Sequence, residues 1–147
     1  MVVPLTPERF TDLITLVNAL ADYEHLDRPS PDAVERLREA ALGERPRIEC
    51  FLAVDGNEAV GYAITLETFS SFLAKPTMYL EDLFVLEEHR EKGAGSALFD
   101  HVLNMARERD CGRMEWQVLD WNNLARDFYH RRNAEWMKEW LVYRITL

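Results

Sequence analysis

The sequence contains few residues of the kinds that define several protein classes. Only two of its 147 residues are cysteines, and it has six glycines and six prolines. Cys50 and Cys111 are far apart in the chain, so they provide neither a disulfide framework nor the closely spaced ligands of a zinc site. The four histidines are scattered, and no pair has metal-ligand spacing. We therefore predict reduced thiols and no bound metal.

Long apolar runs are also missing. No run approaches the roughly 18 residues that indicate a membrane span. The first ten residues, MVVPLTPERF, lack the basic and apolar regions of a signal peptide. These absences predict a soluble, cytoplasmic protein with no membrane partner.

Positive charge is scarce as well. The chain has 17 Lys and Arg residues against 26 Asp and Glu residues, giving a formal net charge of −9. Nucleic acids call for a basic surface, so this balance argues against a nucleic-acid partner. It gives weak support to a cationic partner, because a negative field attracts positive ligands.

The chain as a whole has the size and apolar content of one compact domain, residues 1–147, with 48% hydrophobic residues. Hydrophobic periodicity predicts helices and strands in an order typical of an α/β (α+β) fold, with a mixed, mostly antiparallel sheet flanked by helices. The expected helices are 7–24, 31–41, one after the glycines at 93 and 95, and 124–132; the expected strands are 48–54, 60–66, 78–85, 113–119 and one or two within 135–147.

Several residues in the connections suggest local structure. Thr6 and Ser30 are candidate N-caps, and Gly43 can end the second helix. Phe69 and Phe72 lie in a polar connection. We interpret them as core residues under a loop, with one wall of a substrate pocket as the alternative.

The stretch with the strongest functional signal runs from strand 78–85 into the amphipathic helix that follows it. Gly93 and Gly95 lie at the turn between them. The first amides of a helix have no intrahelical acceptor, and glycines let an anion approach them closely. The turn is therefore a candidate anion site, although a tight strand-to-helix connection would have the same composition. The third glycine of a dinucleotide fingerprint is absent, and Lys92 precedes the glycines, unlike the lysine of a P-loop.

Two adjacent carboxylates, Glu81 and Asp82, interrupt the apolar strand before this turn. Strict alternation would place Glu81 with Leu83 on one face, and Asp82 with Leu80 and Phe84 on the other. A buried carboxylate must be paired, neutralised or hydrated. The pair therefore indicates a catalytic or substrate-binding acid, or else an edge strand or a structural ion pair.

Taken together, these segments resemble the GNAT N-acetyltransferases over nearly the whole chain. Within that superfamily the chain is most similar to the diamine (spermidine/spermine) and thialysine acetyltransferase branch. Residues 70–74 depart from the acidic and tryptophan pattern of the animal spermine enzymes, and Asn133 stands where the family often has glycine. The resemblance is carried by 20–24 (LADYE), 79–85 (YLEDLFV), Arg90-x-x-Gly93-x-Gly95-Ser96, 118–122 (VLDWN), and Phe128-Tyr129 followed by Arg131 and Arg132.

The resemblance implies a binding site for acetyl-CoA and no metal. The cofactor would lie along main-chain groups of one strand and place its diphosphate on the glycine turn. For Arg131 and Arg132, at the end of the last expected helix, a charged helix end facing solvent is the alternative. The implied cofactor-binding residues are Phe84, Val85, Arg90, Glu91, Lys92, Gly93, Ala94, Gly95, Ser96, Asn122, Tyr129, Arg131 and Arg132.

The resemblance also implies direct acetyl transfer to a primary amine of a small cationic substrate. Glu81 matches the position of the general base, and Tyr129 matches the acid that protonates the departing thiolate. An amide near Leu83 would polarise the thioester carbonyl. Asp82, and more weakly Glu24, would attract a second positive charge, although each could equally be a solvated acid.

Other interpretations of these residues stay open. Tyr129 could instead be an ordinary aromatic residue on a buried helix face. The acceptor could be a protein N-terminus or lysine, or the chain could be a non-catalytic acyl-CoA-binding module. Several members of the resembling family form homodimers, and the aromatic C-terminal residues offer an interface for one.

Overall fold

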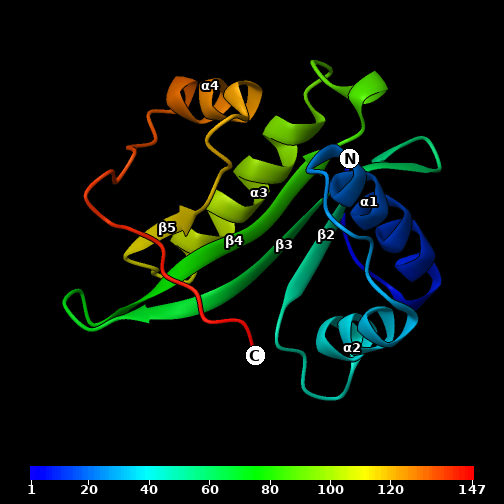
Figure 1. The fold of residues 1–147 in the computed structure, drawn as a ribbon, viewed down its shortest axis with the longest axis horizontal. Coiled ribbons are helices and arrows are strands. Elements are labelled where there is room, and N and C mark those ends of the chain that lie inside the picture. The colour runs from blue at the N-terminus through cyan, green and yellow to red at the C-terminus, as the bar shows by residue number, and fades with distance from the viewer. The chain divides into compact units, whose positions relative to one another are not determined.

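The computed structural model describes residues 1–147, which form two compact units, Met1–Trp116 and Gln117–Leu147. The first unit contains a five-stranded sheet in the order β1-β2-β3-β4-β5. Neighbouring strands are antiparallel except β4 and β5, which are parallel, so the predicted mixed, mostly antiparallel sheet is confirmed (Figure 1). The strands are β1 (Val2–Pro4), β2 (Glu49–Asp55), β3 (Glu58–Ser70), β4 (Lys75–Val85) and β5 (Arg113–Trp116); the helices are α1 (Phe10–Tyr23), α2 (Pro31–Leu42), α3 (Ala94–Glu108) and α4 (Asn123–Arg131), with short 3-10 turns η1 (Pro7–Arg9) and η2 (Glu87–His89).

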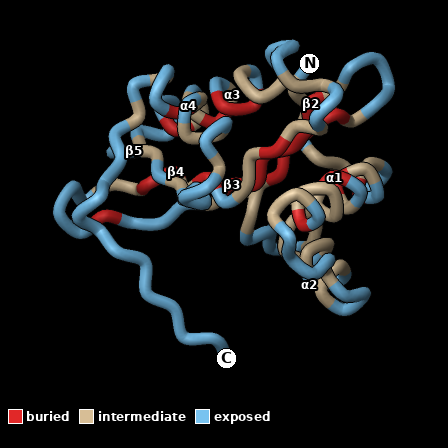
Figure 2. The backbone as a smooth tube through the Cα atoms, turned by 45° about the horizontal axis from the view of Figure 1, so that its top comes forward, coloured by how far each residue is buried: buried red, intermediate tan, exposed pale blue.

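The sheet of the first unit is buried on both faces. Because successive strand residues point to opposite faces, Cys50 and Leu52 of β2 face α1, whereas Phe51 faces α3. The Phe51 ring contacts that of His101, with the two ring centroids 4.5 Å apart. Figure 2 shows the buried segments concentrated on β2, β3, β4 and the inner faces of α1 and α3. The α1 side of the core consists of Phe10, Leu13, Leu16, Cys50, Leu52, Tyr62, Ile64 and Phe84, and the α3 side includes Leu98, Phe99 and Val102.

The helix boundaries follow local signals in the sequence, with one exception. The Ser30 side chain accepts a hydrogen bond from the Ala33 amide at 3.2 Å, and Gly43 is the C-cap of α2, as predicted. Thr6 makes no side-chain cap, and the first turn after it is the 3-10 turn η1. The expected helix over 7–24 therefore begins as a true α-helix only at Phe10.

Residues 135–147 differ from the prediction. They contain no strand, and every one of them is exposed (Figure 2). Aromatic and β-branched residues favour a strand, but a strand forms only where a neighbour supplies its backbone hydrogen bonds. No strand pairing includes this segment, so the predicted closing strands are wrong.

The hairpin formed by β3 and β4 also corrects an interpretation. Phe69 is 69% exposed and Phe72 is 98% exposed, near the connection between the two strands. They are not core residues under a loop. The hairpin extends past the end of β2, because the pairing of β2 with β3 ends at Glu49 while that of β3 with β4 continues to Ser70 and Lys75.

Candidate active site

The two carboxylates of β4 are separated by an irregularity in strand pairing. Asp82 lies opposite Ile64, but Leu80 lies opposite the next residue, Thr65, so Glu81 has no partner and forms a β-bulge. Neighbours on β3 point to opposite faces, and opposed residues share a face. Asp82 therefore faces α1, whereas Leu80 faces α3, which corrects the strict alternation expected from the sequence.

The bulge leaves Glu81 at the surface and turns Asp82 inward. Glu81 is exposed, and Asp82 is only partly exposed on the α1 side of the sheet. The hydroxyl of buried Thr65 donates a hydrogen bond to the Tyr79 carbonyl at 2.9 Å and so satisfies a backbone acceptor next to the bulge. The two acids are thus adjacent in sequence but have different surroundings.

Asp82 forms a hydrogen bond across the sheet. The Tyr62 hydroxyl donates to Asp82 Oδ2 at 3.1 Å. Burial raises the pKa of Asp82 to about 6; the Tyr62 hydrogen bond opposes this shift, and the negative charges of Glu81 and Glu24 add to it. The Tyr62 pKa is itself raised, first by burial and then by the charge of Asp82. Asp82 can therefore change its charge near neutral pH.

Sequence reasoning missed Tyr62. It lies on an apolar strand and is fully buried, with a ring centroid 6.3 Å from that of Phe84. A buried tyrosine hydroxyl normally has a hydrogen-bond partner, and the only signal in the sequence was this requirement. Asp82 could be identified as that partner only from the register of β3 and β4, which includes the bulge.

Glu24 lies at the C-terminal end of α1, on the same side of the sheet as Asp82. It is the C-cap residue of the helix, and its pKa is raised by burial. Its charge also contributes to the raised pKa values of Tyr62 and Asp82. The structure therefore brings the two predicted substrate-binding acids Glu24 and Asp82 into one electrostatic neighbourhood.

Beyond the bulge, β4 has a strand neighbour on one edge only. β5 pairs with residues 77–80 of β4 and ends at Trp116, whereas β3 continues alongside residues 82–85. The side chain of Phe84 is buried in the core. At the edge of β4 that has no strand neighbour, this residue therefore presents only its main-chain groups. An open strand edge presents amides and carbonyls to which an extended ligand can hydrogen-bond.

The glycine turn begins α3 without any protein cap. Gly93 has a φ of 90°, a conformation that residues with side chains rarely adopt, and it makes no side-chain cap. The first turn of α3 contains no acidic residue, whereas α2 begins with the Ser30 cap and Asp32. A Cβ added at Gly93 would meet nothing within 4 Å, so space is open beside these amides. This turn fits an anionic group.

The three charged residues before the turn differ in their exposure and contacts. Lys92 and Glu91 are exposed, and Glu91 has a positive φ of 62°. The Arg90 side chain instead contacts the protein: its Nε donates a hydrogen bond to the Val85 carbonyl at 3.0 Å. Its guanidinium also lies over the Tyr23 ring, 4.9 Å from the centroid.

The remaining predicted cofactor residues lie in the second unit. The Asn122 side chain accepts a hydrogen bond from the Ala125 amide at 3.1 Å and caps α4. Tyr129 is buried, and burial raises its pKa to about 12. The Arg132 guanidinium lies 4.7 Å from the Phe128 ring centroid, whereas Arg131 is exposed. Their roles toward a cofactor stay predictions.

Asn133 follows α4 in the left-handed conformation, with a φ of 59°. Asparagine tolerates this conformation better than most residues, as expected from its place where the resembling family often has glycine.

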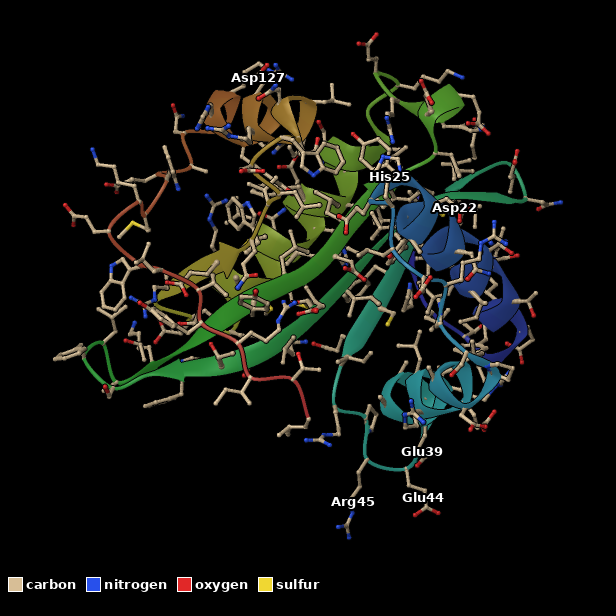
Figure 3. All side chains as sticks on the ribbon, viewed as in Figure 1. Asp22, His25, Glu39, Glu44, Arg45 and Asp127 are labelled. Atoms are coloured by element: carbon tan, nitrogen blue, oxygen red, sulfur yellow. The ribbon has the colours of Figure 1, made fainter.

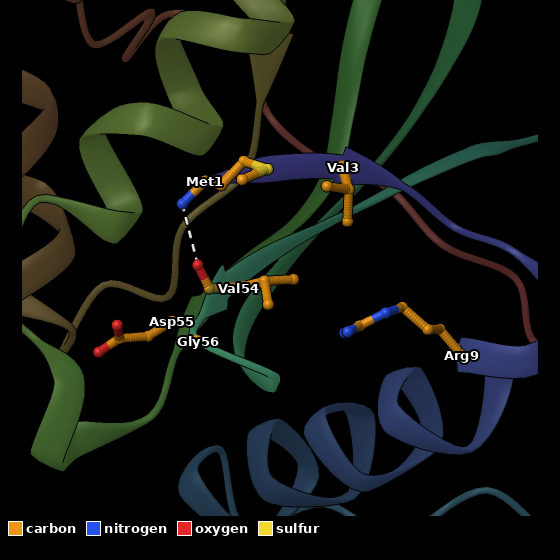
Figure 4. A pocket seen from close by; sticks show the side chains of 6 residues that line it. All are labelled: Met1, Val3, Arg9, Val54, Asp55 and Gly56. Carbon is orange, nitrogen blue, oxygen red and sulfur yellow. Dashed lines mark hydrogen bonds between the residues drawn. The ribbon is translucent and has the colours of Figure 1, made fainter.

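Two hollows lie near the β1 and β2 end of the sheet. The larger, about 450 Å³, is lined by Met1, Val3, Arg9, Val54, Asp55 and Gly56 (Figure 4) and contains none of the predicted site residues. The second, about 280 Å³, reaches the glycine turn at Gly93 and Ala94. No three His, Cys, Asp or Glu side chains converge as metal ligands. None of the helices combines the length and apolar character needed to cross a membrane.

Comparison with known proteins identifies the family. A model of the acetyltransferase (GNAT) family matches residues 13–134. The chain is 38% identical over 125 residues to the L-ornithine N5-acetyltransferase NATA1 of Arabidopsis thaliana, an alignment that covers 82% of this chain and 55% of that protein. The chain thus spans about half the length of this relative.

Two further matches agree with that family. The thialysine N-epsilon-acetyltransferase of Bos taurus is 31% identical over 144 residues, covering 90% of this chain and 84% of the relative. The crystal structure of a probable acetyltransferase superposes with a TM-score of 0.86 at 22% identity, covering 100% of this chain and 97% of that one, and it supports the fold alone. The predicted similarity to the thialysine branch is confirmed. The chain belongs to the acetyltransferase (GNAT) family.

Proposed function

We propose that the chain is an acetyl-CoA-dependent N-acetyltransferase that acts on a primary amine of a small cationic substrate. The observation that carries this proposal is the β4 bulge. It places exposed Glu81 beside inward-facing Asp82, where β4 has a free edge and shortly before the uncapped glycine turn. A carboxylate, a strand edge that can bind an extended ligand, and a candidate anion site thus follow one another within about 15 residues of the chain.

The same residues support the proposed binding of acetyl-CoA. Main-chain groups of Phe84 and Val85 would hold the extended part of the molecule, and amides from Gly93 to Ser96 would hold its diphosphate. Gly95 allows a close approach, because an added Cβ would meet only Val85 Cγ2, at 3.6 Å. Asn122, Arg131 and Arg132 are retained as further contacts of the second unit.

The proposed chemistry divides the proton movements between two residues. When bound, acetyl-CoA supplies an activated acetyl thioester. Glu81, exposed at the bulge, takes a proton from the ammonium form of the acceptor, directly or through water, so that the nitrogen lone pair becomes available. The Leu83 amide would donate a hydrogen bond to the thioester oxygen, and Tyr129 would give a proton to the departing sulfur. The second proton that the nitrogen loses would return through water to Tyr129.

The substrate class is proposed from the acids on the α1 side of β4. Asp82 and Glu24 would bind the second positive charge that a diamine or a basic amino acid carries. Both carboxylates are partly buried and repel each other, so their charged forms are costly without a cation beside them. Relatives named for ornithine and thialysine support this choice, since both of those molecules carry two amines.

The proposal is tested with a thiol-release assay on diamines, ornithine, thialysine, aminoglycosides and peptides, together with calorimetry of CoA binding. We expect turnover with a small dication and a fall of roughly 100-fold or more in kcat for Glu81→Gln. Turnover with peptides alone would indicate a protein acetyltransferase. CoA binding without any turnover would indicate a binding module, and no CoA binding at millimolar concentration would refute the proposal entirely.

We also propose a homodimer and a cytoplasmic location. The exposed apolar residues of the C-terminal segment, among them Trp136, Trp140 and Tyr143, support an interface with a second copy. Cys50 and Cys111 are free thiols, which suits a reducing compartment. Light scattering coupled to size-exclusion chromatography tests the dimer, and a monomer at micromolar concentration would contradict it.

A further inference from the structure

The side chain of Arg90 makes its contacts on the α1 side of the sheet. We propose that Arg90 is a positioning residue that fastens the C-terminal end of α1 to the end of β4, and so sets the acceptor-amine site. This inference rests on the function proposed above. It assigns the Arg90 side chain to the acceptor half of the site, although its place in the sequence motif suggested a contact with the cofactor.

Three contacts define this link. Arg90 Nε donates to the Val85 carbonyl at 3.0 Å, which fixes the guanidinium to the last residue of β4. The guanidinium carbon lies 4.9 Å from the Tyr23 ring centroid and 5.7 Å from that of Phe84. A guanidinium that donates in its plane and stacks on its face can hold two elements at once, which an ammonium group does less well.

The helix end that Arg90 holds carries a proposed substrate ligand. Tyr23 is the last residue of α1, and Glu24 follows it directly as the C-cap. The Tyr23 ring also approaches Phe84, with centroids 6.3 Å apart. Asp22 and His25, on either side, lie at this end of the helix (Figure 3). The position of the Glu24 carboxylate therefore depends on how Tyr23 is held.

The C-terminal end of α1 is closed by local backbone hydrogen bonds, such as that from the Leu26 amide to the Ala21 carbonyl at 2.9 Å, and these bonds do not tie it to the sheet. Asp22 forms an ion pair with Arg28, but both side chains are more than half exposed, so the pair contributes little. His25 has a positive φ of 57°, and residues 25–28 are exposed. A contact that ties this end of α1 to β4 therefore has a larger effect on its position than it would in a packed helix interior.

An effect on Glu24 reaches the acceptor site through charge. The Glu24 charge contributes to the raised pKa values of Asp82 and Tyr62, so these groups interact. If α1 moves away, the second carboxylate moves with it, and a dication loses one of its two proposed partners. The expected consequence is weaker binding of the amine with little change in the affinity for CoA.

The test compares four variants. Arg90→Met removes the link, Arg90→Lys keeps the charge without the planar fork, and Lys92→Met removes the charge of an exposed neighbour in the turn. Arg45→Met is the matched control, because Arg45 is an exposed arginine after α2, away from all of these contacts (Figure 3). KM for the dication, KM for acetyl-CoA and the calorimetric Kd for CoA are measured for each.

For Arg90→Met we expect KM for the dication to rise about 10-fold, with the Kd for CoA changed less than about 2-fold. Arg90→Lys should recover only part of the loss. Lys92→Met should show the opposite pattern, with weaker CoA binding and an unchanged KM for the amine. A fall of 10-fold or more in CoA affinity for Arg90→Met, with an unchanged KM for the amine, would overturn the proposal.

Hydrogen exchange separates this inference from the proposed function. In the protein without ligand, Arg90→Met should speed amide exchange in residues 20–28 and leave α2 unchanged, and Tyr23→Leu should reproduce that pattern. If exchange in 20–28 matches that of wild type and of Arg45→Met, the link does not exist. If exchange rises but no amine is acetylated, the link stands and the proposed function fails.

Discussion

The two halves of β4 differ in how they are supported. Residues 77–80 have β3 on one edge and β5 on the other, and Thr77, Met78 and Leu80 are buried. Residues 81–85 have only β3 beside them, and they include both carboxylates. The bulge at Glu81 lies at the boundary between the halves. The well-packed half holds the sheet together, and the half with the open edge carries the groups available for chemistry.

This difference explains why the strand tolerates two adjacent carboxylates, Glu81 and Asp82. A carboxylate between two strands and two helical layers would be left without water. Here the strand loses one neighbour at the point where the acids begin, and the bulge sends them into different surroundings. The cost of burying Asp82 is reduced by Tyr62, which donates to it across the pair of strands.

The largest expected effect comes from inserting one alanine after Glu81. The single extra residue at the bulge keeps Leu80 facing α3 and Asp82 facing α1, so a second one must widen the bulge or turn one half of β4 to the opposite face. We expect the insertion to abolish cooperative unfolding, measured by circular dichroism in urea. Glu81→Ala keeps the bulge and should change the free energy of unfolding by less than about 0.5 kcal/mol, because the side chain is exposed. An insertion variant as stable as wild type would contradict the assigned register.

The next effect compares matched leucines in the two halves. Leu80 is 2% exposed, whereas Leu83 is only partly buried. Leu80→Ala should lower the free energy of unfolding by about 3 kcal/mol, through lost burial and a cavity, and Leu83→Ala by about 1 kcal/mol. Urea titrations measure both. Equal losses would show that the open half is packed as tightly as the other.

A smaller effect is expected from Asp82→Asn, and it depends on pH. Because burial raises the pKa of Asp82 to about 6, the folded state holds this proton more tightly than the unfolded state does. Wild-type stability therefore decreases as the pH rises from about 4 to about 6, the interval between the two pKa values, and stays lower above it. Asparagine has no such charge and can still accept from Tyr62.

The variant should consequently be more stable than wild type by roughly 2 kcal/mol at pH 8, allowing for partial hydration of the site, and equal to it below about pH 4. Thermal unfolding across that range measures the difference. In the wild type, KM for a dication should fall as the pH rises through about 6, where Asp82 gains its charge. A stability difference that does not vary with pH would exclude a perturbed carboxyl at this position.

A small, stabilising effect is expected at Gly95. A Cβ there would make an ordinary contact with Val85, and alanine favours a helix over glycine, so Gly95→Ala should stabilise the fold by up to about 1 kcal/mol. The added methyl group would nevertheless lie where the proposed diphosphate approaches the amides. We expect the Kd for CoA to rise several-fold in calorimetry. Unchanged CoA affinity would remove Gly95 from the proposed site.

Much of this architecture could be predicted from the sequence because it depends on local chemistry. Ser30 and Gly43 mark the ends of α2, and the Gly56 turn joins β2 and β3 with a positive φ of 58°. The glycine turn before α3 was identified by the same kind of signal. The predicted family also followed from short motifs, and the comparisons confirm it.

The misplaced features all depend on partners that are distant in sequence. The bulge at Glu81 arises from pairing with Ile64 and Thr65, so the face of Asp82 could not be read from alternation alone. Phe72 is exposed at the tip of the hairpin formed by β3 and β4, and residues 135–147 form no strand. The contact of the Arg90 guanidinium with Tyr23 also joins distant parts of the sequence, and the role of Arg90 toward the cofactor stays a prediction.

The sequence by itself determined most of the helices and strands and the glycine turn that begins α3, because propensity, capping and glycine conformation act over a few residues. Only the tertiary structure decided that Asp82 faces Tyr62 while Glu81 faces solvent, and that the Arg90 guanidinium lies over the Tyr23 ring. The physical reason is that register and burial are properties of two strands or two layers together. One extra residue in a pairing changes the environment of every side chain that follows it.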